Sequence, residues 1–303
     1  MIRRLKYNEI DFEKYTKCLE NSEQRKYSAT KDFLDITSNK QWELLVYKDY
    51  DAVMPIPYVY KFGIKIVHNP MLCQQLGIFS KQDSAALNED FLSFLEKNYL
   101  IRIYPFNDFN QFCSGLKKKK NYIIYPDIYE KVYAKYSPKR KRKLRSEPEI
   151  LKNSEIKEIS FNDAETFIKS NFLGANKEQD ISRFVNIFKK FYDSGYVIFS
   201  AYFYKDKIVN IVAVYSDKKV NALLGTFNDK NYVKISGASI LIDNIIKQNI
   251  EKKVFDFEGS ELPNVEEFFR GFRPDLKPFY IIENSKKDLI KRFLSMKYLF
   301  SKQ

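Results

Sequence analysis

The fold is decided by residues 234–283, which read KISGASILIDNIIKQNIEKKVFDFEGSELPNVEEFFRGFRPDLKPFYIIE. Small residues, Ser236 to Ser239, come first, and they let a ligand approach the backbone closely. Apolar residues then recur at helical spacing from Ile240 to Ile246. A small-residue turn at the start of a helix offers free N–H groups and the positive end of the helix dipole, which suits a phosphate group. Such turns also serve ordinary packing, so both explanations remain open.

The rest of this stretch predicts three further elements. Residues 254–257 form a short buried strand, a helix follows Pro263, and residues 279–282 form a last strand. Because Pro278 precedes that strand, we expect it at a sheet edge.

The composition is that of a globular protein of two ordinary domains. The chain has 303 residues, of which 44% are hydrophobic and 16% aromatic. No apolar run approaches the ~20 residues of a membrane helix, and the N-terminus does not resemble a signal peptide. We therefore expect a cytoplasmic protein. Three distant cysteines and one histidine predict neither disulfides nor a metal site.

The order of predicted elements indicates an α/β protein with mixed sheets. The first half alternates helices and strands, with prolines at 55 and 57 that favour an exposed or short strand over 51–60. The second half has two helices and then three alternating strands over 196–204, 208–215 and 220–227, joined by tight turns. These three strands predict an antiparallel meander that leads into the small-residue turn.

A basic segment separates the two halves. Residues 117–145 hold twelve Lys or Arg against Asp127 and Glu130, a net charge of +10, whereas the whole chain carries +13. Ser137 and Pro138 predict the start of a short helix that is cationic nearly all round, and Pro148 predicts its end. A solvated linker and a surface for an anionic partner are equally consistent with it.

The turn resembles the pyrophosphate loop of the GNAT acyltransferase superfamily. Residues 234–239, KISGAS, are similar to its (Gln/Arg)-x-x-Gly-x-(Gly/Ala) pattern, with Lys234 and Ser239 as departures. The following FDFEGS and EEFFRGF resemble the C-terminal signature of the FemAB-like branch, which contains tandem-GNAT aminoacyltransferases. That resemblance implies an N-terminal GNAT-like domain without a phosphate loop over 1–136, a basic helical linker over 137–152 and a GNAT acyltransferase-like domain over 153–303.

The resemblance also implies roles for individual residues. The donor's phosphates would bind at the turn, through Lys234, Ser236, Gly237, Ala238 and Ser239. The Fem-type enzymes hold the reacting carbonyl with a lysine, and Phe269 stands in that place here, with Arg270 as the nearest cation.

A Ser-x-x-x-Arg-Arg-like segment between the domains of the relatives faces the acceptor's phosphates. Arg142 matches that segment, and we place Lys139 and Lys143 beside it as substrate-binding residues.

Two residues are candidates for catalysis. Glu258 follows a buried strand, where burial would raise its pKa toward that of a useful base, although its residue type and position favour a hydrogen-bonded structural carboxylate slightly more. Arg270 lies among Phe268, Phe269 and Phe272, so we expect it to be stacked on them and paired with a carboxylate, or to contact an anion. GNAT-type transfer needs no covalent nucleophile, which agrees with the absence of a serine–histidine motif.

Three classes of function remain. The first is an acyltransferase or aminoacyltransferase that moves an acyl group from acyl-CoA or aminoacyl-tRNA to an amine on a phosphate-bearing acceptor, such as a cell-wall precursor or a nucleotide-linked substrate. The second is a non-catalytic nucleic-acid-binding protein that uses the basic segment and its tyrosines. The third is a protein that contacts an anionic membrane with the same segment. We favour the first.

Overall fold

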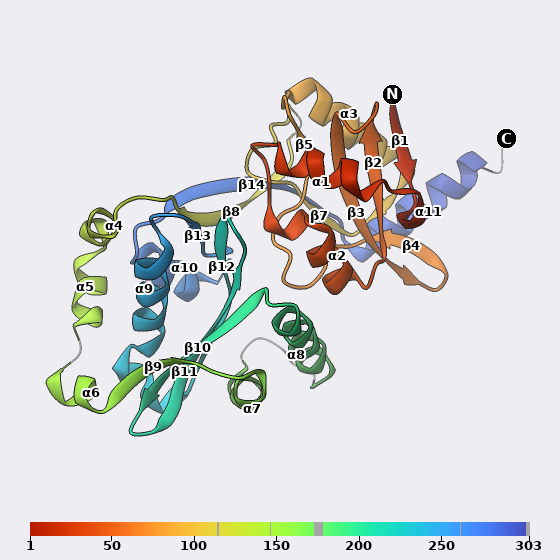
Figure 1. Ribbon diagram of the computed structural model, residues 1–303. Coiled ribbons are helices and arrows are strands. Elements are labelled where there is room, and N and C mark those ends of the chain that lie inside the picture. The colour runs from red at the N-terminus through yellow and green to blue at the C-terminus, as the bar shows by residue number, and fades with distance from the viewer. Residues whose placement is uncertain (114, 146, 173–177, 261, 301–303) are drawn as a thin grey trace. The chain divides into compact units, whose positions relative to one another are not determined.

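The computed structural model describes residues 1–113, 115–145, 147–172, 178–260 and 262–300 (Figure 1). The chain forms two compact units. Unit 1 consists of residues 1–119 and 278–303, and unit 2 consists of residues 120–277. The expected boundaries at 136 and 152 fall inside unit 2, because the helices of the basic segment pack within that unit.

Unit 1 is built on a sheet with the order β1-β2-β3-β4-β6, in which β5 also pairs with β3. Its pairs are antiparallel except β4 with β6. The largest fully buried side chains in its core are those of Trp42, Tyr15 and Tyr104, followed by four phenylalanines at 33, 79, 91 and 106. The elements of unit 1 before the crossing to unit 2 are β1 (Ile2–Leu5), α1 (Phe12–Glu20), α2 (Lys31–Ser38), β2 (Trp42–Tyr47), β3 (Ala52–Lys61), β4 (Ile64–Val67), β5 (Phe79–Ser80), α3 (Ala85–Asn98), β6 (Leu100–Ile101) and β7 (Ile103–Pro105).

Strand β3 is central and buried, which corrects the expectation that Pro55 and Pro57 mark an exposed or short strand. One side of β3 pairs with β2 along its first six residues. On the other side, β5 pairs with residues 52–53 and β4 with residues 58–61. The prolines lie in the gap between these two partners, where a missing N–H interrupts neither ladder.

The last strand is not at an edge, which corrects a second expectation. Residues 281–283 of β14 (Asp275–Glu283) pair antiparallel with β7. The beginning of β8 (Lys117–Ile124) also contacts β14, because the Lys117 ammonium lies 4.0 Å from a Glu283 carboxylate oxygen and that of Lys118 lies 4.6 Å from the Tyr280 ring centre. Pro278 precedes the residues paired with β7, so it removes no hydrogen bond there. After β14 the chain ends in α11 (Lys286–Phe300).

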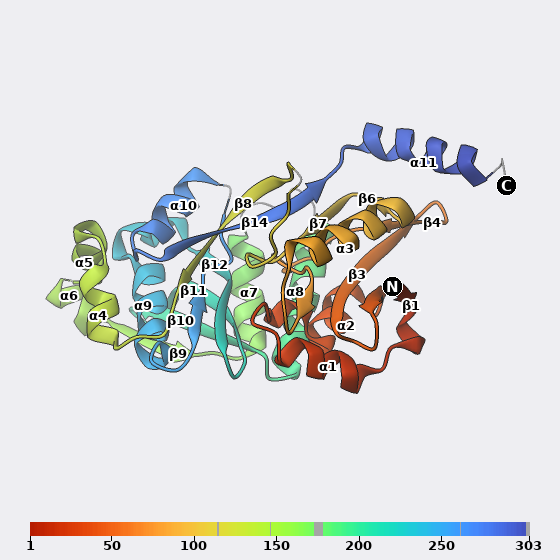
Figure 2. The ribbon, with the colours of Figure 1, turned by 90° about the horizontal axis from the view of Figure 1, so that it is seen from above.

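Unit 2 contains the predicted antiparallel meander within the order β8-β13-β12-β11-β10-β9. Helix α9 packs on one face of these strands, and α7 and α8 cover the other face (Figures 1 and 2). The parallel pair β12–β13 makes the sheet mixed, so the predicted α/β class is confirmed. The elements are α4 (Tyr129–Lys135), α5 (Pro138–Leu144), α6 (Pro148–Lys152), β9 (Ser154–Glu158), α7 (Phe161–Asn171), α8 (Glu178–Asp193), β10 (Val197–Tyr204), β11 (Lys207–Ser216), β12 (Val220–Asn228), the 3-10 helix η3 (Lys230–Ile235), α9 (Gly237–Asn249), β13 (Val254–Asp256) and α10 (Pro263–Arg270).

Two short helices, α5 and α6, stand where one helix from Ser137 to Pro148 was expected. As predicted, Ser137 caps α5, and its hydroxyl accepts a hydrogen bond from the backbone N–H of Arg140 at 3.2 Å. Helix α5 already ends at Leu144, because the backbone leaves the helical region at Arg145. Pro148 therefore begins α6 instead of ending α5, in the first helical position that proline favours.

The thiols of unit 1 give a simple test of its packing. Cys18 and Cys73 are buried and Cys113 is exposed. Burial raises the pKa of the Cys18 thiol to about 11, which suppresses the reactive thiolate. In a titration with Ellman's reagent at pH 8, we expect one thiol to react rapidly in the native protein and three in denaturant. Two or more fast thiols in the native protein would contradict this packing.

Candidate functional site

The only parallel pair of described strands in unit 2 determines where its ligand site should lie. Residues 220–222 of β12 pair with residues 254–256 of β13, and β12 then continues to Asn228 while β13 ends at Asp256. The crossover helix α9 begins after the carboxyl end of β12. In open α/β sheets, ligands bind outside the carboxyl ends of such strands.

The start of α9 has unsatisfied donors. Ser236 caps the helix in the left-handed conformation, with φ 64° and ψ 22°, and its side chain makes no capping hydrogen bond. The N–H groups of Ser239 and Ile240 bond to the Ser236 carbonyl oxygen at 2.9 and 3.3 Å. Those of Gly237 and Ala238 find no partner within the described part of the chain. Together with the dipole of a 13-residue helix, these two groups can hold an anion.

Gly237 is glycine because another side chain occupies the space of its missing Cβ. A Cβ there would lie 1.9 Å from Asn210 Oδ1 and 3.1 Å from Tyr202 Cδ1. Asn210 is buried on β11, and its Nδ2 donates to Asn228 Oδ1 at 2.7 Å. The close approach of the turn to β11 therefore fixes the position of the helix start.

The other residues of the predicted phosphate loop differ in their exposure to solvent. Ser239 is buried, Ala238 and Ser236 are half-buried, and Lys234 is exposed in the last turn of η3. A phosphate at the turn would thus meet backbone groups first and the Lys234 ammonium at the rim.

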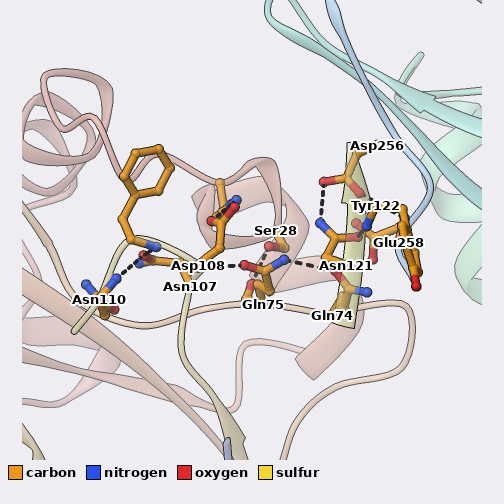
Figure 3. A network of polar contacts seen from close by, with 12 residues as sticks. Ser28, Gln74, Gln75, Asn107, Asp108, Asn110, Asn121, Tyr122, Asp256 and Glu258 are labelled. Atoms are coloured by element: carbon orange, nitrogen blue, oxygen red, sulfur yellow. Dashed lines mark hydrogen bonds and ion pairs between the residues drawn. The ribbon is translucent and has the colours of Figure 1, made fainter. Parts of the chain in front are cut away.

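Glu258 lies in a strained turn at the carboxyl end of β13. Its φ of 59° is unusual for a residue with a side chain, and Gly259 continues the turn at φ 56°. The Glu258 N–H donates to Asp256 Oδ1 at 2.8 Å, and Asn121 Nδ2 donates to Asp256 Oδ2 at 3.2 Å (Figure 3). The buried Asp256 thus holds the turn that carries Glu258, at the end of the sheet where α9 begins.

The structure places Arg140, not Arg270, among the phenylalanines. Arg140 is only 4% exposed, and its guanidinium carbon lies 4.3 and 4.1 Å from the ring centres of Phe268 and Phe272. Its Nη2 donates to the Phe268 carbonyl oxygen at 2.6 Å, and its Nη1 donates to Ser239 Oγ. Arg140 therefore joins α5 to α10 and to the start of α9, whereas Arg270 is exposed, which corrects the expectation that Arg270 is stacked.

Gly271 makes room for this guanidinium. A Cβ on Gly271 would lie 3.0 Å from Arg140 Nη2 and 3.1 Å from Nε. The backbone of Gly271 is in the ordinary helical conformation. The close approach of the Arg140 side chain, and not backbone freedom, therefore explains why the EEFFRGF motif has glycine here.

The buried guanidinium has few partners for its charge. Burial lowers the pKa of Arg140 to about 10, with Tyr136 and Asp243 opposing that shift, so the group is still cationic near neutral pH. Asp243 on α9 accepts hydrogen bonds from the Tyr129 hydroxyl at 3.0 and 2.9 Å, and burial raises the pKa of its carboxyl. Arg140 Nε has no hydrogen-bond partner among the described residues.

A pocket of about 520 Å³ lies between α5 and α10. Five cations line it against one carboxylate, that of Glu267, which pairs with Lys139 at 2.8 Å. Burial and the neighbouring cations lower the pKa of Lys143, as crowding of like charges requires. The pocket therefore attracts anions. Its lining residues are Ser137, Lys139, Arg140, Lys143, Asn264, Glu267, Phe268, Arg270, Gly271 and Arg273.

The pocket brings together some of the predicted site residues. Lys139, Lys143 and Arg270 share it, whereas Arg142 is exposed on α5 and outside its lining. Sequence reasoning missed Arg140 and Arg273. A signal for Arg140 was present, because Tyr136, Arg140 and Leu144 follow one another at four-residue spacing and all three side chains turn toward the core.

Phe269 stands where the sequence resemblance predicts a lysine. It is 6% exposed, and its ring centre lies 5.0 Å from that of Phe257. The side chain thus belongs to the apolar core of unit 2.

The described residues contain neither a metal-binding cluster nor a membrane-spanning helix. No group of three or more His, Cys, Asp or Glu side chains in that part of the chain is placed to hold a metal. None of its helices has the length and apolar character needed to cross a membrane.

Comparison with solved structures identifies the fold. FemX matches with a TM-score of 0.64 at 9% identity, over 91% of this chain and 96% of FemX. The chain has the FemAB-like, tandem-GNAT fold. The L-PGS of Bacillus licheniformis matches with a TM-score of 0.52 at 13% identity, over 94% of this chain and 96% of that one. A tandem GNAT protein from the clavulanic acid biosynthesis pathway matches with a TM-score of 0.50 at 7% identity, over 93% and 97%.

The predicted FemAB-like fold is thereby confirmed. A scan against protein-family models and a search of curated proteins found no match. At identities of 7–13%, the structural likeness concerns the fold of this chain and not its substrates.

Proposed function

We propose that this FemAB-like protein is an acyltransferase that moves an acyl or aminoacyl group from acyl-CoA or aminoacyl-tRNA to an amine of a phosphate-bearing acceptor. The observation that carries the proposal is the start of α9, where the N–H groups of Gly237 and Ala238 have no partner among the described residues, at the carboxyl end of a parallel strand pair. Both kinds of donor carry phosphates that such a helix start can bind.

The chemistry requires few groups from the protein. A deprotonated amine of the acceptor attacks the carbonyl carbon of the donor, and the thiol of CoA or the ribose oxygen of tRNA leaves. Glu258 would accept the proton that the attacking amine gives up and would pass it to the departing sulfur or ribose oxygen. The N–H groups at Gly237 and Ala238 and the Lys234 ammonium would fix the donor, so that positioning supplies much of the rate enhancement.

The acceptor's phosphates would occupy the pocket between α5 and α10. Lys139, Lys143, Arg270 and Arg273 supply four cations there in addition to the buried Arg140. A cell-wall precursor or another nucleotide-linked substrate has phosphates of this kind. Arg142, outside the lining, would add only to the long-range field that attracts an anion.

The alternative of a nucleic-acid-binding protein is less well supported by the tyrosines of the basic segment. Tyr122 and Tyr136 are buried, and the Tyr129 hydroxyl bonds to Asp243. The buried rings of Tyr122 and Tyr136 are therefore not available as stacking platforms for bases, although Tyr125 is 39% exposed.

The substitution Ala238→Asp separates donor binding from folding. A carboxylate in the first turn of α9 stabilises the helix slightly but repels the donor's phosphates. We expect the affinity for the donor to fall by roughly tenfold, which corresponds to about 1.4 kcal/mol, while the Tm stays the same or rises. Calorimetry with acetyl-CoA and filter binding with aminoacyl-tRNA measure the two candidate donors.

The matched control is Ala86→Asp, which places the same carboxylate at the second position of α3 in unit 1. It should leave donor affinity unchanged. If neither donor binds the wild-type protein, or if Ala238→Asp binds its donor as tightly as the wild type, the start of α9 is not the donor site.

A further inference from the structure

The hairpin between β3 and β4 ends in an exposed aromatic ring. Lys61 pairs with Ile64, so Phe62 and Gly63 form a two-residue turn with φ values of 52° and 75°. Two-residue hairpin turns of this kind favour glycine, asparagine and aspartate at both positions. Phe62 instead is fully exposed, and Tyr60 nearby is 55% exposed. A bulky residue held against its conformational preference, with no packing partner, indicates a role outside the fold.

Helix α11 carries a second exposed apolar stripe in the same unit. Ile290 and Leu294, one helical turn apart, are each 61% exposed. Lysines at 286, 287 and 291 are exposed on the same helix. The one acid among them, Asp288, is engaged with the Ser285 N–H and hydroxyl at the helix start.

The hairpin and α11 are joined through β6. Asn284, just before α11, donates from Nδ2 to the Ile101 carbonyl oxygen at 2.8 Å. Strand β6, which contains Ile101, pairs with β4 of the hairpin. Both views show the β4 hairpin and α11 at the same end of unit 1 (Figures 1 and 2).

We propose that this end of unit 1 binds the surface of an anionic lipid bilayer. We call it the tip surface and define it by Tyr60, Phe62, Ile290 and Leu294 with Lys61, Lys286, Lys287 and Lys291. The apolar side chains enter the interface between headgroups and acyl chains, and the lysines contact the anionic headgroups.

The composition of the tip surface favours a bilayer over a protein partner. Lysine is depleted in protein–protein interfaces, whereas clustered lysines beside exposed aromatic and aliphatic residues are typical of membrane-surface binding. Lys65 of the same hairpin is not part of the tip surface, because it pairs with the buried Glu43. The proposal goes beyond acyl transfer, since it needs neither donor nor acceptor.

The test is cosedimentation with vesicles of phosphatidylcholine alone and with added phosphatidylglycerol. The wild-type protein should partition onto the mixed vesicles, and less so at high salt. Phe62→Gly should weaken that binding by roughly tenfold, because the burial of one aromatic side chain is lost, while the Tm does not fall. Replacing Lys286, Lys287 and Lys291 with glutamine should weaken it by about fivefold per lysine.

Controls outside the tip surface are Leu151→Ser, which removes a 57% exposed apolar side chain of α6, and Lys190→Gln on α8. Both should bind vesicles as the wild type does.

The proposal is overturned if the wild-type protein does not bind the mixed vesicles, or if Phe62→Gly binds them as tightly as the wild type. If Phe62→Gly binds vesicles as the wild type does but no longer captures a protein that the wild type captures, the tip surface binds a protein instead. Affinity for acetyl-CoA or aminoacyl-tRNA should be the same in all variants, so failure here leaves the proposed function untouched.

Discussion

Replacing Arg140 with alanine is expected to lower the free energy of unfolding by about 3 kcal/mol. The substitution removes a guanidinium stacked on Phe268 and Phe272 and leaves a void between α5 and α10. It also removes the hydrogen bonds to Ser239 Oγ and the Phe268 carbonyl oxygen, and it takes a positive charge away from the half-buried Asp243. The expected loss is a large part of the stability of an ordinary domain.

Two further variants separate the causes. Arg140→Met keeps most of the volume and leaves no buried cation to desolvate, so we expect a much smaller loss of about 1 kcal/mol. Arg142→Ala changes an exposed cation on the same helix and should alter the stability by less than about 0.5 kcal/mol.

Urea unfolding followed by circular dichroism measures these differences. The single tryptophan, Trp42, is buried in unit 1, so its fluorescence shows whether that unit unfolds in the same transition. Equal stabilities of Arg140→Ala and Arg142→Ala would mean that Arg140 is not the buried link between α5, α9 and α10.

The substitution Gly237→Ala is expected to cost about 2 kcal/mol, because the new methyl group has no room. Its carbon would lie 1.9 Å from Asn210 Oδ1, so the Asn210 side chain must leave its place and give up its bond to Asn228. Substitution at this residue therefore disturbs folding and donor binding together, which is why Ala238→Asp is the better probe of binding.

A double-mutant cycle tests the cause of that cost. Asn210→Ala removes the atoms that the methyl group meets, so the double variant should be more stable than the sum of the single effects by about 1 kcal/mol or more. Gly115→Ala is the control, since a Cβ at Gly115 meets no atom within 4 Å. Additive effects of Gly237→Ala and Asn210→Ala would show that the contact with Asn210 does not explain the glycine.

Most of the secondary structure could be predicted from local signals. The cap at Ser137, the three-stranded meander and the helix after the small-residue turn all follow from neighbouring residues, and the structure confirms them. The predictions were wrong where contacts between segments distant in the sequence determine the strand pairing. The prolines of β3 fit because β5 and β4 pair on either side of them, and β14 gains a second neighbour from residues more than 150 positions away.

The candidate site was predicted only in part for the same reason. Sequence reasoning identified the turn at Gly237, since small residues before an apolar helix are a local pattern. It missed Arg140, because a cation in a highly charged helix indicates solvent exposure until the aromatic rings that cover it are known. Asp256 was likewise missed as a support for the Glu258 turn, since its partner Asn121 lies 135 residues earlier.

The division of unit 1 into residues 1–119 and 278–303 also bears on how the chain is made on the ribosome. Synthesis proceeds from the N-terminus, so β7 emerges long before β14, its antiparallel partner. Unit 2, contained within residues 120–277, can finish folding while one edge of unit 1 still has unpaired backbone groups. The middle of the nascent chain can therefore finish folding before the strand that completes unit 1 is made.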